Sequence, residues 1–151
     1  MKTVTRALVV RSVDYKDSDK ILTLLTPDMG KLSAGARGCR KKGSAIAAAC
    51  QLLCWSELVL SDRGGKWSVS EASTLREFLG VRRDLDKLAL ACYFAEMAEV
   101  LSVEGMPSPG LLSLTLNSLH ALECLDRPPE QIKAGFELKA MCLAGYEPLI
   151  E

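Results

Sequence analysis

A run of basic residues in the first third of the chain is the feature whose chemistry is clearest. Within twelve residues it holds five cations and no acid: Lys31, Arg37, Arg40, Lys41 and Lys42. On a strand, residues 31 and 37 share one face and lie roughly 20 Å apart. Ser33 and Gly35 between them are small enough for a sugar–phosphate backbone to approach. The pattern predicts a surface that neutralises phosphates without reading base sequence.

Residues on neighbouring expected strands would enlarge this surface. Lys20 and Arg11 would extend the basic stripe, and Tyr15 is the one aromatic residue that we expect in a nucleic-acid contact. Trp55 and Trp67 are instead expected to pack in the core or between domains, because buried tryptophan contributes strongly to packing. A merely solvated basic face is the competing interpretation, and the pattern alone leaves both open.

Catalytic residues do not form a recognisable set. The sequence lacks a P-loop and a Gly-x-Ser-x-Gly motif, and its single histidine, His120, has no credible catalytic partner. The six cysteines predict buried free thiols, since no secretion signal precedes them and Cys50 and Cys54 have no second pair at zinc-binding spacing. We therefore expect no enzyme, no cofactor and no metal site in these residues.

The first half of the chain is predicted to form short strands that position the basic residues. These segments are rich in β-branched residues or alternate apolar with polar residues, and turn signals such as Pro27–Gly30 separate them. We expect strands over 4–13, 20–26, 31–37, 51–61 and 66–72, with a short Ala-rich turn over 44–50. Five strands in this order predict an OB-fold barrel, with a small open sheet or an SH3-like barrel as the alternative.

From about residue 73 the hydrophobic period changes to that of helices. We expect a short linker helix over 71–79, stopped by Gly80, and longer helices over 82–104, 111–125 and 129–144. The first long helix has a broad apolar face, which includes Leu85 and Phe94 and must be covered by other elements. Gly145 is expected to cap the last helix, and Pro148 forbids its continuation.

The predicted fold class is α+β with two domains, a five-stranded OB-fold barrel over 1–79 and an all-α helical domain over 80–151. The 151 residues carry 19 Lys and Arg against 19 Asp and Glu. Residues 1–80 nevertheless hold 13 basic and 8 acidic side chains, and residues 81–151 hold 6 and 11. This asymmetry predicts units with different partners. No signal peptide or membrane span is visible, so we expect a cytoplasmic protein without a membrane partner.

Several motifs resemble, in the same order, those of one bacterial family. They are Ala7-Leu-Val-Val-Arg-Ser-Val-Asp-Tyr-Lys-Asp-Ser-Asp-Lys-Ile-Leu-Thr-Leu-Leu-Thr-Pro27, Gly30-Lys-Leu-Ser-Ala-Gly-Ala-Arg-Gly38, Leu85-Asp-Lys-Leu-Ala-Leu-Ala-Cys-Tyr-Phe-Ala-Glu96, Glu104-Gly105 before a Pro-containing loop, and Phe136-Glu-Leu-Lys-Ala-Met-Cys-Leu-Ala-Gly-Tyr146. Over essentially the whole chain they resemble RecO, the bacterial recombination mediator.

The resemblance implies an OB-fold followed by a helical domain. It implies binding of single- and double-stranded DNA, annealing of complementary strands, and work with RecR to load recombinase onto DNA coated with single-stranded-DNA-binding protein. DNA is then expected on the basic strand and loop, at Lys31, Arg37, Arg40, Lys41 and Lys42. The acidic, hydrophobic tail of the single-stranded-DNA-binding protein is expected on the helical domain, where any contact would use local cations such as Arg82 or Arg83. The implied location is the bacterial cytoplasm, in association with the nucleoid.

The chain departs from the family pattern after its Gly-Tyr segment. Family members usually run on into a cysteine-bearing, often zinc-binding segment, whereas this sequence stops at Glu151. We therefore expect an incomplete helical domain with exposed apolar surface, and zinc only in a longer form. The expected function is a non-enzymatic, strand-annealing recombination mediator, with a protein-interaction adaptor or an RNA-binding OB-fold protein as the alternative.

Overall fold

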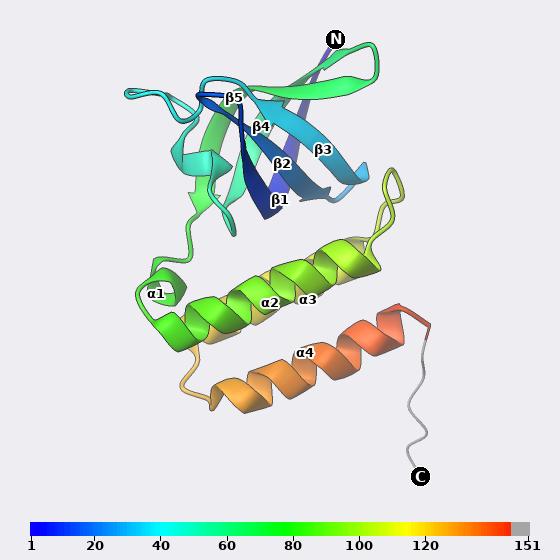
Figure 1. Ribbon diagram of the computed structural model, residues 1–151. Helices are drawn as coiled ribbons and strands as arrows, with labels where there is room; N and C mark the ends of the chain where they lie inside the picture. Colours follow the sequence, from blue (N-terminus) through cyan, green and yellow to red (C-terminus); the bar gives the residue numbers. More distant parts are fainter. Residues whose placement is uncertain (146–151) are drawn as a thin grey trace.

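A computed structural model describes residues 1–145, in which a barrel of strands is followed by a bundle of helices (Figure 1). The strands are β1 (Lys2–Tyr15), β2 (Asp19–Thr26), β3 (Gly30–Ala36), β4 (Trp55–Arg63) and β5 (Lys66–Arg76). The helices are the 3-10 turn η1 (Ala48–Cys50), α1 (Leu79–Arg82), α2 (Leu85–Leu101), α3 (Pro109–Cys124) and α4 (Pro129–Leu143). The predicted α+β class, with strands first and helices second, is confirmed.

The barrel closes in the strand order β1-β2-β3-β5-β4. The long strand β1 pairs with both β2 and β4, and a register shift between Val9 and Arg11 lets it bend from one to the other. Closure also requires a parallel contact between β3 and β5, at Ala34 with Trp67 and Gly35 with Ser68. With η1 between β3 and β4, this is the topology of an OB-fold, so that prediction is confirmed.

Strand β3 shows the alternation that its sequence predicts. Leu32, Ala34 and Ala36 are buried in the barrel core, whereas Lys31, Ser33 and Gly35 turn outward. The rest of that core comes mainly from β1, β2 and β4, through Ala7, Val9, Leu22, Leu24, Leu58 and Leu60. The outward residues of β3 are therefore available to a ligand.

The expected linker helix over 71–79 is wrong. Residues 71–76 continue β5, which stays paired with β4 as far as Trp55 with Arg76, because the backbone groups of β4 need a partner along their length. The only helix at this junction is the single turn α1, and Gly80 lies inside it. Strand β4 also begins later than predicted, at Trp55, because Leu53 takes a left-handed φ of 73°.

Helix α2 is shorter than predicted at both ends. It begins at Leu85, because the Asp84 side chain caps it by accepting hydrogen bonds from the backbone N–H groups of Asp86 and Lys87. Its predicted apolar face is only partly right: Phe94 is fully buried, but Leu85 is 81% exposed. The three alanines buried on α2, Ala91, Ala95 and Ala98, are small and therefore allow close packing.

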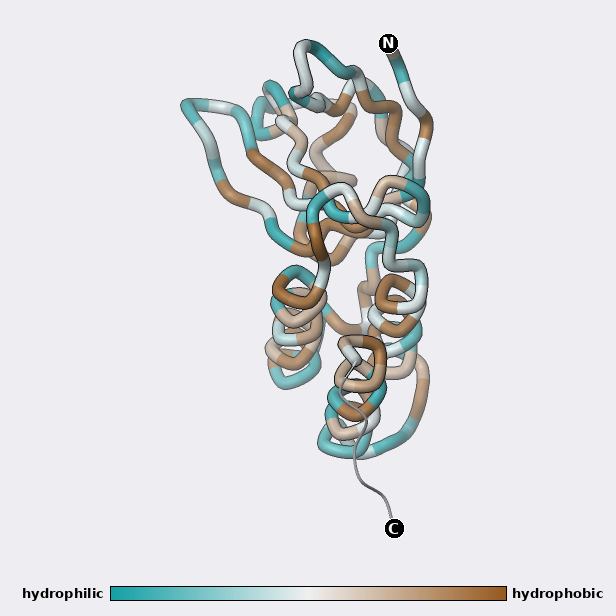
Figure 2. The backbone as a smooth tube through the Cα atoms, turned by 90° about the vertical axis from the view of Figure 1, so that its right-hand side faces the viewer, coloured by the Kyte–Doolittle hydropathy of each residue, from teal (hydrophilic) through white to brown (hydrophobic). Residues whose placement is uncertain are grey.

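The helices share one core with the outer side of the barrel. Leu8, Val10 and Leu25 of the barrel belong to the same buried cluster as Phe94 and Phe136, whose rings stack with centroids 4.3 Å apart. Seen nearly end-on, α2, α3 and α4 form a triangle beneath the barrel (Figure 2). Barrel and helices are thus held together by buried apolar contacts.

Helix α4 ends as the sequence predicts. Gly145 has a φ of +90°, and its N–H donates to the Cys142 carbonyl, so it caps the helix after Leu143. Pro148 lies outside the described residues. No helix within residues 1–145 is long and apolar enough to cross a membrane.

The cysteines are free thiols, as predicted, but not all of them are buried. Cys39, Cys50 and Cys54 are buried, whereas Cys124 and Cys142 are exposed at the ends of α3 and α4. Nowhere in residues 1–145 do three His, Cys, Asp or Glu side chains gather as metal ligands. The described residues therefore do not fit a zinc site.

Candidate nucleic-acid interface

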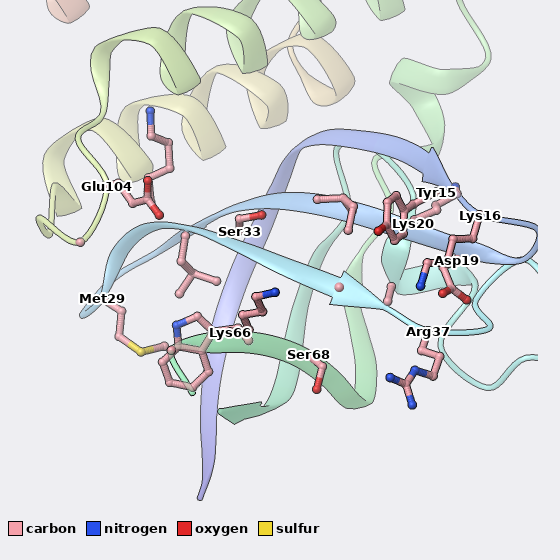
Figure 3. A pocket seen from close by; sticks show the side chains of 18 of the residues that line it. Tyr15, Lys16, Asp19, Lys20, Met29, Ser33, Arg37, Lys66, Ser68 and Glu104 are labelled. Atoms are coloured by element: carbon pink, nitrogen blue, oxygen red, sulfur yellow. The ribbon is translucent and has the colours of Figure 1, made fainter. Parts of the chain in front are cut away.

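A groove of about 930 Å³ crosses the outer face of the barrel (Figure 3). Its floor is formed by β2, β3 and the start of β5, and its rim by the β1–β2 loop, the β4–β5 turn and the α2–α3 loop. The face of strands 2 and 3, with the loops between strands 1 and 2 and strands 4 and 5, is where OB-folds hold oligonucleotides. The groove thus has the position of a nucleic-acid site.

Five cations line this groove, and three of them were predicted from the sequence. They are Lys16, Lys20, Lys31, Arg37 and Lys66. In Figure 3, Lys16, Lys20 and Arg37 lie near one end of the groove, together with Tyr15. Met29 and Glu104 mark the other end, and Lys66 lies between the two ends. Lys20, Lys31, Arg37 and Tyr15 all line this groove, and their contact with DNA stays a prediction.

Sequence reasoning missed several groove residues, among them Lys16, Lys66 and Glu104, and it assigned Trp67 to packing alone. Lys66 and Trp67 reach the groove only because the start of β5 pairs with β3, a contact across more than thirty residues that has no local signal. Trp67 packs against the barrel core, as expected, but it is only partly buried and also lines the groove. Trp55 packs against the cluster shared by barrel and helices, as predicted.

Arg40 lies outside the groove lining and holds two loops together. Its Nη2 donates to the Lys16 carbonyl at 2.7 Å, its Nε to the Asp19 carbonyl at 3.2 Å, and its Nη1 lies 3.5 Å from an Asp14 carboxylate oxygen. Asp19 strengthens the same junction, because its carboxylate accepts the Gly38 N–H at 2.7 Å. The Arg40 guanidinium thus positions the β1–β2 loop, which carries Lys16 into the groove.

Of the other predicted cations, Arg11, Lys41 and Lys42 lie outside the groove lining, whereas Lys31 is part of it. Arg11 stands beside α2, with its Nη1 3.9 Å from a Glu99 carboxylate oxygen. Lys41 and Lys42 are exposed on the loop after β3, outside the groove lining. Lys31 lines the groove, but one hydrogen bond of its ammonium is already donated to the Glu99 carbonyl, at 2.8 Å.

The groups whose pKa is shifted are not groove residues. Burial, and then the neighbouring Cys39 thiol, raises the pKa of Cys50 to about 12, and burial also raises the pKa of Cys54 and Cys92. The pKa of Tyr93 is raised because its hydroxyl donates to Glu137 at 2.6 Å. These shifts follow from burial and packing. What the groove offers is cationic side chains and a partly exposed indole, which suit phosphates and bases.

Comparison with known proteins identifies the family. The family model described as "Recombination protein O N terminal" matches residues 1–78, and the model described as "Recombination protein O C terminal" matches residues 82–151. A protein of Acetivibrio thermocellus named DNA repair protein RecO is 34% identical over 146 residues, which are 97% of this chain and 58% of that protein.

Two further relatives with the same name agree. The protein of Dehalococcoides mccartyi strain BAV1 is 33% identical, over 95% of this chain and 56% of its own length. The protein of Desulfitobacterium hafniense strain DCB-2 is 35% identical, over 94% of this chain and 51% of its own length. The chain thus spans somewhat more than half of these relatives, and it belongs to the RecO family.

Proposed function

We propose that the protein is a non-enzymatic mediator of recombination in DNA repair and that it binds single-stranded DNA in the barrel groove. The observation that carries the proposal is the gathering of Lys16, Lys20, Arg37 and Lys66 on the oligonucleotide face of an OB-fold. The name of the relatives, DNA repair protein RecO, supports the same role.

The proposed mechanism is neutralisation of phosphate charge. Lys20, Arg37 and Lys66 hold the phosphates of one strand, and Tyr15 and Trp67 offer rings on which bases stack. Because no base edge is read, the bases remain free to pair with a complementary strand. Lys41 and Lys42, exposed on the loop after β3, reduce the repulsion of that second strand. Annealing and binding to double-stranded DNA follow from the same charges.

A second groove, between α3 and α4, supports a protein partner. Its volume is about 520 Å³, and it combines apolar residues such as Leu114 and Leu143 with the cations Arg127 and Lys139. This chemistry suits the acidic, hydrophobic tail of the single-stranded-DNA-binding protein. Arg82 was one of the cations expected from the sequence to contact this tail. Its guanidinium instead donates hydrogen bonds to the backbone carbonyls of Glu77 and Leu52.

The proposed cellular role is loading of recombinase with RecR onto DNA coated with single-stranded-DNA-binding protein, in the bacterial cytoplasm at the nucleoid. A pull-down with RecR and single-stranded-DNA-binding protein, with and without nuclease, tests these partners. Capture of RecR by a protein that fails to bind DNA would favour the alternative, a protein-interaction adaptor. Competition between RNA and DNA strands of equal length tests the RNA-binding alternative.

The DNA site is tested with the double variant Arg37→Glu/Lys66→Glu in a fluorescence-anisotropy titration of labelled oligo-dT. The matched control is Arg83→Glu/Lys133→Glu, which changes net charge equally at two exposed residues away from the groove. Loss of two phosphate contacts should lower affinity at low salt by about tenfold or more and flatten the slope of log K against log salt by about 1.4. Equal losses of DNA affinity in both variants, or no loss in the groove variant, would show that the groove is not the DNA site.

A further inference from the structure

One end of the barrel groove is built by the helical domain. The loop between α2 and α3 reaches up beside the β2–β3 turn (Figure 1). Residue 104 in this loop forms a parallel bridge with Lys31 of β3, and the Gly105 N–H donates to the Lys31 carbonyl at 3.0 Å. Glu104 and Gly105 therefore line the groove together with barrel residues.

This loop is fastened to the barrel at further points. The Lys31 ammonium donates to the Glu99 carbonyl of α2 at 2.8 Å. On the other side, a Cβ on Gly30 would collide with the Met106 carbonyl group, so the loop backbone packs directly on the β2–β3 turn. The position of Glu104 at the groove is thus set by the bond between Lys31 and Glu99 before it in the chain and by the packing of Met106 on Gly30 after it.

Charge is unevenly distributed along the groove. Lys16, Lys20 and Arg37 lie near one end with the carboxylate of Asp19, and Glu104 lies with Met29 at the other (Figure 3). Asp28 also lines the groove, next to Met29 in the chain. The cation of this second end, Lys31, is already engaged by the Glu99 carbonyl. A phosphate that entered here would therefore meet two carboxylates against one ammonium, which is held at the Glu99 carbonyl, whereas three cations line the other end.

We propose that Glu104 is a specificity-determining residue that excludes phosphates from the helical end of the groove and so limits how much of a DNA strand the groove holds. This proposal rests on the DNA binding proposed above. Phosphates occupy the end with Lys20 and Arg37, and the strand leaves the groove before it reaches the α2–α3 loop. The helical domain thereby sets the footprint of the barrel on DNA.

The test is Glu104→Gln, which removes the charge and keeps the shape, while the bridge to Lys31 is made by backbone atoms. The matched control is Glu71→Gln, an equally conservative change at an exposed residue of β5 outside the groove lining. Affinities for oligo-dT of increasing length are measured by anisotropy at low and high salt, and thermal melts compare the folds of the variants.

Glu104→Gln should bind long oligo-dT about two- to fivefold more tightly than wild type at low salt, with the gain shrinking at high salt. Its salt slope should steepen by about 0.7, the value for one further phosphate, and its affinity should continue to rise with lengths at which the wild type has levelled off. Equal gains in both variants, or none in Glu104→Gln, would overturn the proposal. A wild type without DNA affinity would overturn the proposed function as well, whereas DNA binding that is lost in Arg37→Glu/Lys66→Glu but unaffected by Glu104→Gln would overturn this inference alone.

Discussion

Arg40 lies on the loop after β3, and its substitution by lysine tests whether it positions the β1–β2 loop or only supplies charge. Arg40→Lys keeps the positive charge and removes the geometry of the guanidinium. The guanidinium reaches the Lys16 carbonyl, the Asp19 carbonyl and the Asp14 carboxylate from three different nitrogens. A lysine keeps the positive charge, but its single ammonium cannot reproduce this fork. If Arg40 is a positioning residue, the substitution weakens the β1–β2 loop; if it only supplies charge to DNA, the substitution is neutral.

The expected cost follows from these contacts. Hydrogen bonds from a charged donor contribute about 1.5–3 kcal/mol when well formed, and the exposed pair with Asp14 adds little. Since the Arg40 contacts are exposed and Lys can keep one of them, we expect the free energy of unfolding to fall by about 1–2 kcal/mol in urea denaturation.

The order of the β1–β2 loop and the affinity for DNA give a second measurement of the role of Arg40. Exchange of the Gly38 and Arg40 amide hydrogens, which donate to the Asp19 carboxylate and the Ser18 carbonyl, should become faster in Arg40→Lys, and affinity for oligo-dT should fall several-fold because Lys16 loses its position. Arg37→Lys, at an exposed groove residue, is the control and should bind nearly as well as wild type. If Arg40→Lys retains both loop protection and DNA affinity while Arg40→Gln loses the affinity, Arg40 acts by charge and the positioning role is refuted.

Two further predictions concern stability. Phe136→Ala should lower the free energy of unfolding by about 3–5 kcal/mol in urea, because Phe136 is 1% exposed and stacks on Phe94; an unfolding curve close to wild type would contradict this packing. Burial raises the pKa of the Cys50 thiol from 9.0 to about 12 in the folded protein. Above pH 9.0 the unfolded thiol therefore loses its proton while the folded thiol keeps it, so the free energy of unfolding should fall by at most about 1.4 kcal/mol per pH unit. Urea titrations from pH 8 to 10 should show a shallower decline in Cys50→Ala, and an equal decline in both proteins would exclude Cys50 as the cause.

The groove face of β3 could be predicted from local sequence. Alternation of Leu32, Ala34 and Ala36 with Lys31, Ser33 and Gly35 places one set in the core and the other outside, since a strand has a side-chain period of two. The five strands and the α+β class followed from the same kind of pattern. Over the short segment 71–76 the helical and strand periods of the side chains could not be told apart, and the predicted linker helix was wrong. These residues extend β5, because β4 needs a hydrogen-bonding partner there.

Contacts between distant segments decided which charges line the groove. Pairing of β3 with β5 brings Lys66 and Trp67 into the groove, and docking of the α2–α3 loop on β3 adds Glu104. The same folding removes Arg40 from the groove lining and engages the ammonium of Lys31.

Periodicity is a property of neighbouring residues, and it therefore determined from the sequence which side chains of a strand face outward. Closure of the barrel and packing of the helices join residues far apart in the chain, and they alone decided which of the outward charges line the groove.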